Sequence, residues 1–332
     1  MPVFDHAAGL SPLDGVSLEH GSYLLVLRKA GFLDTLYPVV IQRGEHLRCA
    51  RPGDSSPHPV KLLPLGSLGP EDHYVPAGFC RVGGEGRNAL PRSTVWVDGF
   101  VMRRFPVTTS EYIAFLDALV AAGREDLALA HQPRLSPSGG AGTLPIFGRD
   151  PEGKFVLVPD PEGDLWGQRW PVFHVDFRDA MAYAAWQAEA SGLPWRLPWE
   201  LEREKAGRGA DGRSWPWGDW MEPTWTANQQ ARPGRPSPRP VEEPPEDESV
   251  YGVRGLAGNS RDWCLDLRSG QGLGVRDGLF VPELVPDGGE WRMTRGGAWS
   301  AGPAYGELSQ RLAAPAEFRN ALIGVRVVRS VV

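Results

Sequence analysis

The stretch Arg295-Gly296-Gly297-Ala298-Trp299 lies near the C-terminus, and Ile323-Gly324-Val325-Arg326-Val327-Val328 begins 24 residues after its tryptophan. The two glycines let the backbone turn tightly. Residues 300–306 contain a proline and several small residues, which have low helix and strand propensity and favour a surface loop. We therefore expect Trp299 to be buried behind the glycine turn and Ile323 to lie on a buried closing strand, with an exposed segment between them.

Three further stretches precede this end of the chain. In order, they are Arg196-Leu197-Pro198-Trp199-Glu200-Leu201-Glu202-Arg203-Glu204, Pro216-Trp217-Gly218-Asp219 and Gly255-Leu256-Ala257-Gly258-Asn259. Together with the C-terminal stretches they resemble the formylglycine-generating-enzyme (sulfatase-modifying-factor) superfamily across residues from about 75 to 330. The resemblance implies an α+β, loop-rich domain with a C-type-lectin-like fold. The high numbers of Gly (41) and Pro (32) agree with many loops, because both residues favour turns.

The residues before this domain are predicted to form short strands. Stretches 22–27 and 37–41 are apolar and β-prone, and glycines bound them. They resemble a small β-sandwich module of the PEGA type. We therefore divide the chain into a small β module at residues 1–70 and the lectin-like domain at residues 71–332.

Within the larger domain the sequence predicts two amphipathic helices. Thr108 and Glu111 form a capping box before apolar residues at helical spacing. A second helix is predicted to begin at Asp176. Residues from about 123 to 170 are rich in Gly, Pro and Asp, so we expect an insertion of loops with at most one hairpin.

The composition excludes several classes of partner and location. A net charge of −6 provides no basic surface for nucleic acid or an anionic membrane. No apolar run is long enough to span a bilayer, and the N-terminus lacks the pattern of a secretory signal. Cys49, Cys80 and Cys264 are too few and too scattered for a disulfide framework, which suits a reducing compartment. We therefore expect a cytoplasmic protein without nucleic-acid or membrane partners.

The resemblance also implies where catalytic residues would stand. Oxidase members of the superfamily bind copper through two cysteines, since soft Cu(I) prefers sulfur ligands. At the matching positions this chain has Ala301 and Gly306. A second enzymatic branch binds iron through three histidines with a His-x3-His spacing, which the seven histidines here do not show. We therefore expect no catalytic residue and no catalytic cofactor. The alternative is a formylglycine-generating-enzyme-like oxidoreductase with altered catalytic residues.

The resemblance leaves one metal site open, a structural calcium site. In the superfamily a Gly-Asn-x-x-Glu turn supplies the hard oxygen donors that Ca²⁺ prefers. Here the corresponding residues Asn259, Ser260 and Asp262 are the candidate ligands. Asp262 is shorter than glutamate, and Arg261 adds a positive charge. The alternative is that Asn259 and Asp262 cap the loop without a metal.

A third branch of the superfamily consists of variable proteins diversified by retroelements, which display a binding surface on the same fold. The segment between the two C-terminal stretches has the length of their variable segment. Arg311 and Arg319 fall where that pattern places arginines, whereas Glu307 departs from it. The corresponding ligand-binding residues are Ser300, Ala301, Gly302, Ala304, Tyr305, Leu312, Ala313, Ala314, Phe318, Asn320, Ala321 and Leu322.

From these residues we expect a non-catalytic module that binds a protein or peptide ligand, with or without retroelement diversification. Loops on a rigid scaffold can vary their side chains without disturbing the core. Tyr305 and Phe318 are the aromatic residues among the twelve candidates, and exposed aromatics commonly anchor recognition surfaces. Two alternatives stay open: kinase-linked relatives without diversification have the same spacing, and the segment could merely cap its own domain.

Overall fold

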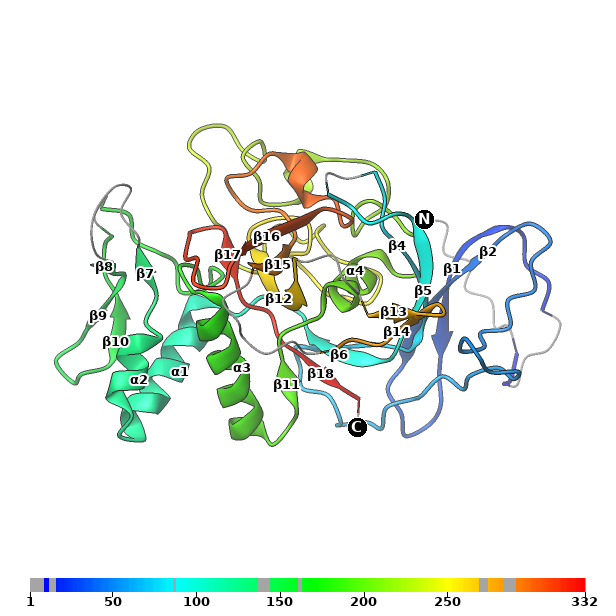
Figure 1. Cartoon of the computed structure of the whole chain (residues 1–332), viewed down its shortest axis with the longest axis horizontal. Coiled ribbons are helices and arrows are strands. Elements are labelled where there is room, and N and C mark those ends of the chain that lie inside the picture. Colours follow the sequence, from blue (N-terminus) through cyan, green and yellow to red (C-terminus); the bar gives the residue numbers. More distant parts are fainter. Residues whose placement is uncertain are drawn as a thin grey trace.

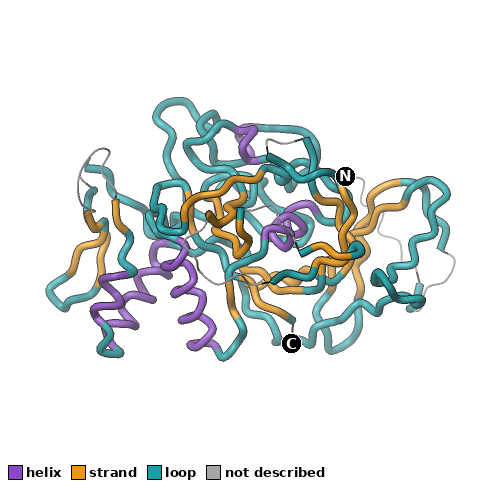
Figure 2. The backbone as a smooth tube through the Cα atoms, viewed as in Figure 1, coloured by secondary structure: helices purple, strands orange, loops and turns teal. Residues whose placement is uncertain are grey.

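The computed structural model describes residues 9–11, 16–85, 88–135, 144–160, 163–268, 274–283 and 291–331. Three four-stranded sheets formed by these residues make the centre of the larger domain (Figures 1 and 2). In spatial order, the first sheet contains β11 (Trp195–Arg196), β18 (Val328–Ser330), β6 (Phe100–Arg103) and β3 (Asp72–Val75). The second contains β16 (Arg311–Pro315), β15 (Trp291–Arg295), β12 (Arg261–Leu267) and β17 (Ile323–Gly324). The third contains β13 (Val275–Arg276), β14 (Leu279–Phe280), β5 (Ser93–Val97) and β4 (Gly78–Val82).

The C-terminal stretches decide the fold because they complete two of these sheets. Strand β18 lies between β6 and β11, so the last residues join the start of the domain to its middle. Strand β17 pairs in parallel with the first residues of β12, and β16 pairs antiparallel with β15. The chain therefore closes its core only when its final segment is in place.

Both predicted helices are present, and their predicted N-caps are confirmed. Helix α1 (Thr109–Ala121) follows Thr108, and α3 (Phe177–Ser191) follows Asp176; each cap side chain accepts a hydrogen bond from the amide three residues on. The helices contact each other through aromatic rings and lie at the lower left of Figure 1. The described helices are all too short or too polar to cross a bilayer.

The segment between α1 and α3 is more structured than its composition predicts. The expectation of at most one hairpin is wrong, because apolar residues between the turns pack on the core: β9 and β10 each contribute a buried phenylalanine. The segment contains helix α2 (Glu125–Ala130), the hairpin of β7 (Arg134–Leu135) with β8 (Leu144–Pro145), and the hairpin of β9 (Phe147–Arg149) with β10 (Phe155–Leu157).

The N-terminal strands form an antiparallel hairpin of β1 (Gly21–Leu27) and β2 (Thr35–Ile41), at the right of Figure 1. Tyr37 and Val39 of β2 are buried, whereas Leu24 of β1 is exposed, so one face of the hairpin packs on the larger domain. The two predicted strands are therefore confirmed. Among the named strands of residues 16–70 there is no second sheet, so the sandwich interpretation of this module stays a prediction.

Helix α4 (Glu200–Arg208) carries a highly charged sequence and is nevertheless buried along its whole length. Each of its charges has a partner, as the desolvation cost of a buried ion requires. Nζ of Lys205 donates hydrogen bonds to the carbonyl oxygens of Pro76, Gly78 and Val97, at 2.7, 3.0 and 2.9 Å. The ion pairs are Glu200 with Arg311, Glu202 with Arg196, Arg203 with Asp262, and Glu204 with Arg208 and Arg295. This network joins α4 to all three sheets.

The two predicted core residues of the C-terminal region differ in burial. Ile323 is buried on β17, as predicted. Trp299 is only half-buried, so its predicted position in the core is wrong. Its indole Nε1 donates a hydrogen bond to the carbonyl oxygen of Ala321 (2.7 Å), and the ring therefore ties the two ends of the segment together. The tryptophan at the centre of the core is Trp263 on β12, which is fully buried.

Candidate recognition surface

Two glycines direct the chain into the C-terminal segment, which we define as residues 300–322. Gly296 has a φ of +101°, and a Cβ on Gly297 would collide with the carbonyl oxygen of Ala257, so both positions require glycine. The segment then forms the 3₁₀ helix η2 (Pro303–Gly306), drawn in orange at the top of Figure 1, and strand β16. Residues 300–306 are thus a loop that ends in a short helix.

Two arginines fix the C-terminal segment to the helices beneath it. Arg311 donates from Nε and Nη2 to the carboxylate of Glu200, both at 2.7 Å. Arg319 contacts Asp176 and Asp179 at the start of α3, each at 2.9 Å. A bidentate arginine–carboxylate pair is both strong and directional. The arginines that the sequence places between the candidate residues therefore have a structural task.

The structure gathers the twelve candidate residues on the C-terminal segment but does not make all of them accessible. Ala304 and Phe318 are exposed, Phe318 by 43%. Ala314 is only 6% exposed, because β16 places it opposite Arg292 in the core, so its prediction as a ligand-binding residue is wrong. Asn320 is half-buried, and its Oδ1 accepts hydrogen bonds from the backbone amides of Leu322 and Ile323. The half-buried remainder is Ser300, Ala301, Gly302, Tyr305, Leu312, Ala313, Ala321 and Leu322.

A cluster of tryptophans lies beside this segment, and the sequence analysis did not predict it. The amide of Gln229 donates to the carbonyl oxygen of Ala301 (3.0 Å), which brings the preceding loop against the segment. In that loop Trp220 is 73% exposed, and the rings of Trp217 and Trp225 meet edge to face with 5.8 Å between centroids. The feature of the sequence that could have indicated this cluster is the high density of tryptophan after residue 214. Exposed aromatic rings favour contact with a partner.

Arg261, the first residue of β12, joins the core to the aromatic part of the surface. Its amide donates to the carbonyl oxygen of Leu322 (2.8 Å), and its guanidinium lies 5.7 Å from the centre of the Tyr305 ring. This is a cation–π arrangement. Burial, opposed by Tyr305 and assisted by the positive charge of Arg203, lowers the pKa of Arg261 to about 10. The side chain remains a cation at neutral pH.

Residues 301 and 306, which the sequence resemblance predicts to match the oxidase cysteines, carry no thiol. Residue 301 is alanine, and a Cβ on Gly306 would collide with the carbonyl oxygen of Ala257, so this backbone has no room for a side chain there. The three cysteines of the chain are free and far apart in the sequence. Cys80 and Cys264 are buried, and burial raises the pKa of Cys80 to about 12, which disfavours a thiolate.

Two of the three candidate calcium ligands, Asn259 and Asp262, have protein partners, whereas the buried hydroxyl of Ser260 has no hydrogen-bond partner among the described residues. The side-chain amide of Asn259 pairs with the backbone N–H and C=O of Arg239, at 3.1 and 2.9 Å. Oδ2 of the buried Asp262 accepts hydrogen bonds from Nε of Arg203 (2.7 Å) and Nε of Arg326 (3.1 Å). This agrees with the alternative in which these side chains hold the loop. The calcium site stays a prediction, and the two guanidinium groups around Asp262 disfavour a cation there.

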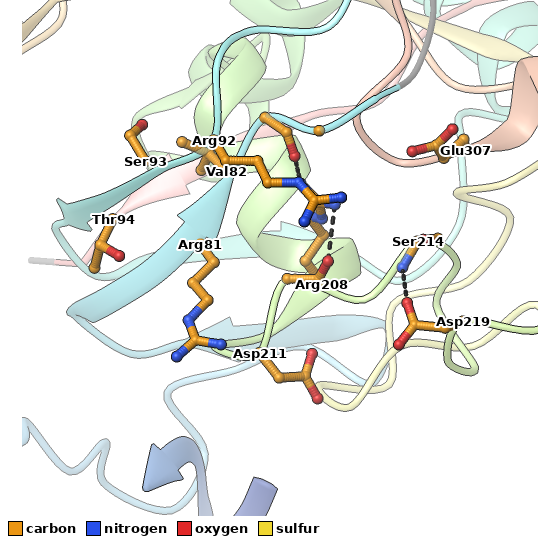
Figure 3. Close-up of a pocket in the computed structure, with 13 residues that line it drawn as sticks. Arg81, Val82, Arg92, Ser93, Thr94, Arg208, Asp211, Ser214, Asp219 and Glu307 are labelled. Carbon is orange, nitrogen blue, oxygen red and sulfur yellow. Dashed lines mark hydrogen bonds between the residues drawn. The ribbon is translucent and has the colours of Figure 1, made fainter. Parts of the chain in front are cut away.

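A polar cavity of about 560 Å³ borders the C-terminal segment at Glu307 (Figure 3). The guanidinium of Arg208 is fixed in its wall by the carbonyl oxygens of Gly83 and Gly212. Hydroxyl groups and charges of both signs suit a small polar molecule. The sequence did not reveal this cavity, because its walls come from three distant parts of the chain. The residues around it are Arg81, Val82, Gly83, Gly84, Arg92, Ser93, Thr94, Arg208, Asp211, Gly212, Ser214, Asp219 and Glu307.

Curated proteins similar to this chain include enzymes. The formylglycine-generating enzyme of Thermomonospora curvata is 27% identical over 263 residues, which cover 70% of this chain and 83% of that protein. The hercynine oxygenase of Mycolicibacterium smegmatis is 32% identical over 234 residues, which cover 65% of this chain and 49% of that protein. The chain thus matches about half the length of the latter.

Solved structures show the same fold. PvdO from Pseudomonas aeruginosa aligns with a TM-score of 0.59 and 23% identity, covering 78% of this chain and 94% of that one. Treponema denticola variable protein 1 aligns with a TM-score of 0.54 and 17% identity, with the same coverage of 78% and 94%. The family model described as "Sulfatase-modifying factor enzyme 1-like domain" matches residues 66–331, which confirms the resemblance seen in the sequence. The chain belongs to this family of sulfatase-modifying factor enzyme 1-like domains.

Proposed function

We propose that this protein is a non-catalytic binding module whose C-terminal segment forms the contact surface for a protein or peptide partner. The observation that carries the proposal is a division of tasks within the segment. Arg311, Arg319 and Ile323 hold it to the core, whereas Phe318 is exposed, Tyr305 is half-buried, and neither ring belongs to the hydrophobic core. Side chains without a structural task can change while the fold is kept.

The loop at residues 217–229, which we call the tryptophan loop, extends this surface. The hydrogen bond between Gln229 and Ala301 sets the loop alongside the segment, so Trp220 and Trp225 add exposed aromatic area to that of Tyr305 and Phe318. Tryptophan and tyrosine are enriched among the residues that dominate binding energy at protein interfaces. We expect the partner to meet this surface in the cytoplasm, in agreement with the sparse, unpaired cysteines.

The competing proposal is an oxidoreductase with altered catalytic residues, because named relatives include a formylglycine-generating enzyme and a hercynine oxygenase. The alanine at residue 301 and the crowded backbone at Gly306 favour the binding proposal. So does the burial of Cys80 and Cys264, since a thiol must be reachable and ionisable to react. The two proposals differ in whether the protein converts a substrate, and an activity assay can test this difference.

Retroelement diversification is a refinement of the binding proposal. It is supported by the length of the segment and by the fold likeness to Treponema denticola variable protein 1. A reverse transcriptase gene and a near-copy of the segment's coding sequence beside this gene would support the refinement. Neighbouring DNA without either would leave a binding module with a fixed surface.

The test is affinity capture from the native host with three forms of the full chain. These are the parent, the surface variant Tyr305→Ala/Phe318→Ala, and the control Leu127→Ala/Leu129→Ala, which removes two exposed leucines from α2. Quantitative mass spectrometry should find a partner that the parent and the control retain and the surface variant loses. Circular dichroism should show the same melting temperature for all three. A partner captured equally by the parent and the surface variant would place the contact elsewhere.

A further inference from the structure

The guanidinium of Arg261 differs from those of Arg203, Arg311 and Arg326, because no carboxylate of the described residues pairs with it. Its Nε is buried without a hydrogen-bond partner among the described residues, and the residue as a whole is only partly buried. By contrast, Arg203 and Arg326 share Asp262, and Arg311 is paired with Glu200. A partly buried cation without a counter-charge costs free energy and is expected to attract an anion.

The charges beneath Arg261 add to this attraction. Arg203 and Arg326 are fully buried and share the single carboxylate of Asp262. The buried Asp247 interacts electrostatically with Arg326 and is held by the backbone amides of Leu256 and Ala257. Three guanidinium groups therefore face two carboxyl groups in this part of the chain. Low local dielectric strengthens the field of the unbalanced positive charge at the surface.

We propose that Arg261 is the receptor for a carboxylate group of the partner, with the Tyr305 ring packed against the guanidinium. This inference rests on the proposed binding function of the C-terminal segment and names the chemistry that the surface recognises. The two terminal amino groups of a guanidinium match the two oxygens of a carboxylate. One guanidinium balances a monoanion, whereas a phosphate dianion would require a second cation. The carboxylate is either an acidic side chain or a chain terminus.

The direct test uses three small probes at constant ionic strength. N-acetyl-glutamate α-amide carries a side-chain carboxylate, N-acetyl-glutamine carries a terminal carboxylate, and N-acetyl-glutamine amide is neutral. The measurement is the NMR shift of the Arg261 Nε–Hε group in the full chain labelled at arginine, assigned with Arg261→Gln. We expect a saturable shift with at least one anionic probe and none with the neutral probe, and the stronger anion identifies the source. Equal responses to all three probes, or none at all, would overturn the proposal.

A second arm separates recognition from a structural role. Arg261→Met removes the charge and keeps a long side chain, and Arg268→Met is the control, because Arg268 lies over the Trp291 ring (4.8 Å) but is exposed. We expect Arg261→Met to keep or raise the melting temperature and to weaken partner binding at least tenfold, while Arg268→Met changes neither. A fall in melting temperature without loss of binding would overturn the proposal. If Tyr305→Ala/Phe318→Ala abolishes binding and Arg261→Met does not, only the carboxylate inference fails.

Discussion

Glu200 and Arg311 form a bidentate ion pair between the buried helix α4 and strand β16, with both nitrogen–oxygen distances at 2.7 Å. Arg311 precedes the half-buried candidates Leu312 and Ala313, and Arg319 follows the exposed Phe318 and pairs with Asp176. The C-terminal segment therefore alternates anchored arginines with side chains that are exposed or half-buried. This alternation explains how one segment can both complete the core and present a surface that is free to vary.

Removing the arginine of this pair should destabilise the protein. In Arg311→Met the fully buried carboxylate of Glu200 keeps only Arg295, at 3.7 Å, as an ion-pair partner among the described residues. Leaving a buried charge without its partner costs about 3 kcal/mol or more. Urea unfolding should show this loss, and the double variant Glu200→Met/Arg311→Met should recover part of it. A loss below about 0.5 kcal/mol, the usual size for a surface change, would mean that the pair does not anchor the segment.

The core and the proposed surface should differ sharply in their tolerance of truncation. Trp263 is fully buried, and its Nε1 donates to the carbonyl oxygen of Val175 (3.1 Å), so Trp263→Ala should cost about 3–5 kcal/mol. Phe318→Ala, at an exposed site, should change the free energy of unfolding by less than about 0.5 kcal/mol. The half-buried Trp299 should fall between them. Urea melts that ranked Phe318→Ala as the most damaging of the three would contradict this division.

Acid should destabilise the fold through His174. This side chain is buried with no hydrogen-bond partner in the described structure, and burial lowers its pKa from 6.5 to about 4. Because the folded pKa lies below the unfolded one, the stability it confers is complete above pH 6.5 and is lost as the pH falls towards 4. The full effect is about 3 kcal/mol.

The matched variant for this titration is His174→Asn, because His174 has a φ of +59° and asparagine tolerates that backbone conformation. Asp179 opposes the effect, since burial raises its pKa to about 6 and its contribution is lost as the pH rises through 6. The difference between parent and variant isolates the histidine. That difference should grow between pH 6.5 and 4, and a constant difference over this range would show that His174 does not titrate there.

The protein should not oxidise a Cys-x-Pro-x-Arg sulfatase peptide. Residues 301 and 306 carry no thiol, and a side chain at residue 306 would collide with the backbone of Ala257. Mass spectrometry of the peptide after aerobic incubation with the protein and Cu(I) should show no aldehyde product. Product formation above a metal-free blank would favour the oxidoreductase proposal instead.

The sequence predicted the fold through residues that meet strict local requirements. Gly297 lies where a Cβ would strike the backbone, and the charges of α4 must meet partners within the core. Few residue types satisfy such conditions, so the matching stretches are recognisable at low overall identity. The capping boxes at Thr108 and Asp176 were equally predictable, because a cap depends only on residues three positions apart.

Features set by contacts between distant residues were not predictable. The burial of Ala314 depends on its pairing with Arg292, and the partial exposure of Trp299 depends on where residue 321 lies. The exposure of Trp220 and Trp225 was also missed, because a tryptophan serves equally well in a core and at an interface. The lack of a counter-charge at Arg261 becomes visible only when its spatial neighbours are known.

The central claim, that the C-terminal segment is the recognition surface, is tested most directly by hydrogen–deuterium exchange of the full chain with and without its captured partner. Amides protected by an interface exchange more slowly, so exchange locates the contact without any substitution. We predict slower exchange in residues 300–306 and 317–322 and in the tryptophan loop at residues 217–229. Protection confined to the polar cavity at residues 81–94 and 208–214, or to the hairpin of β1 and β2, would contradict the account.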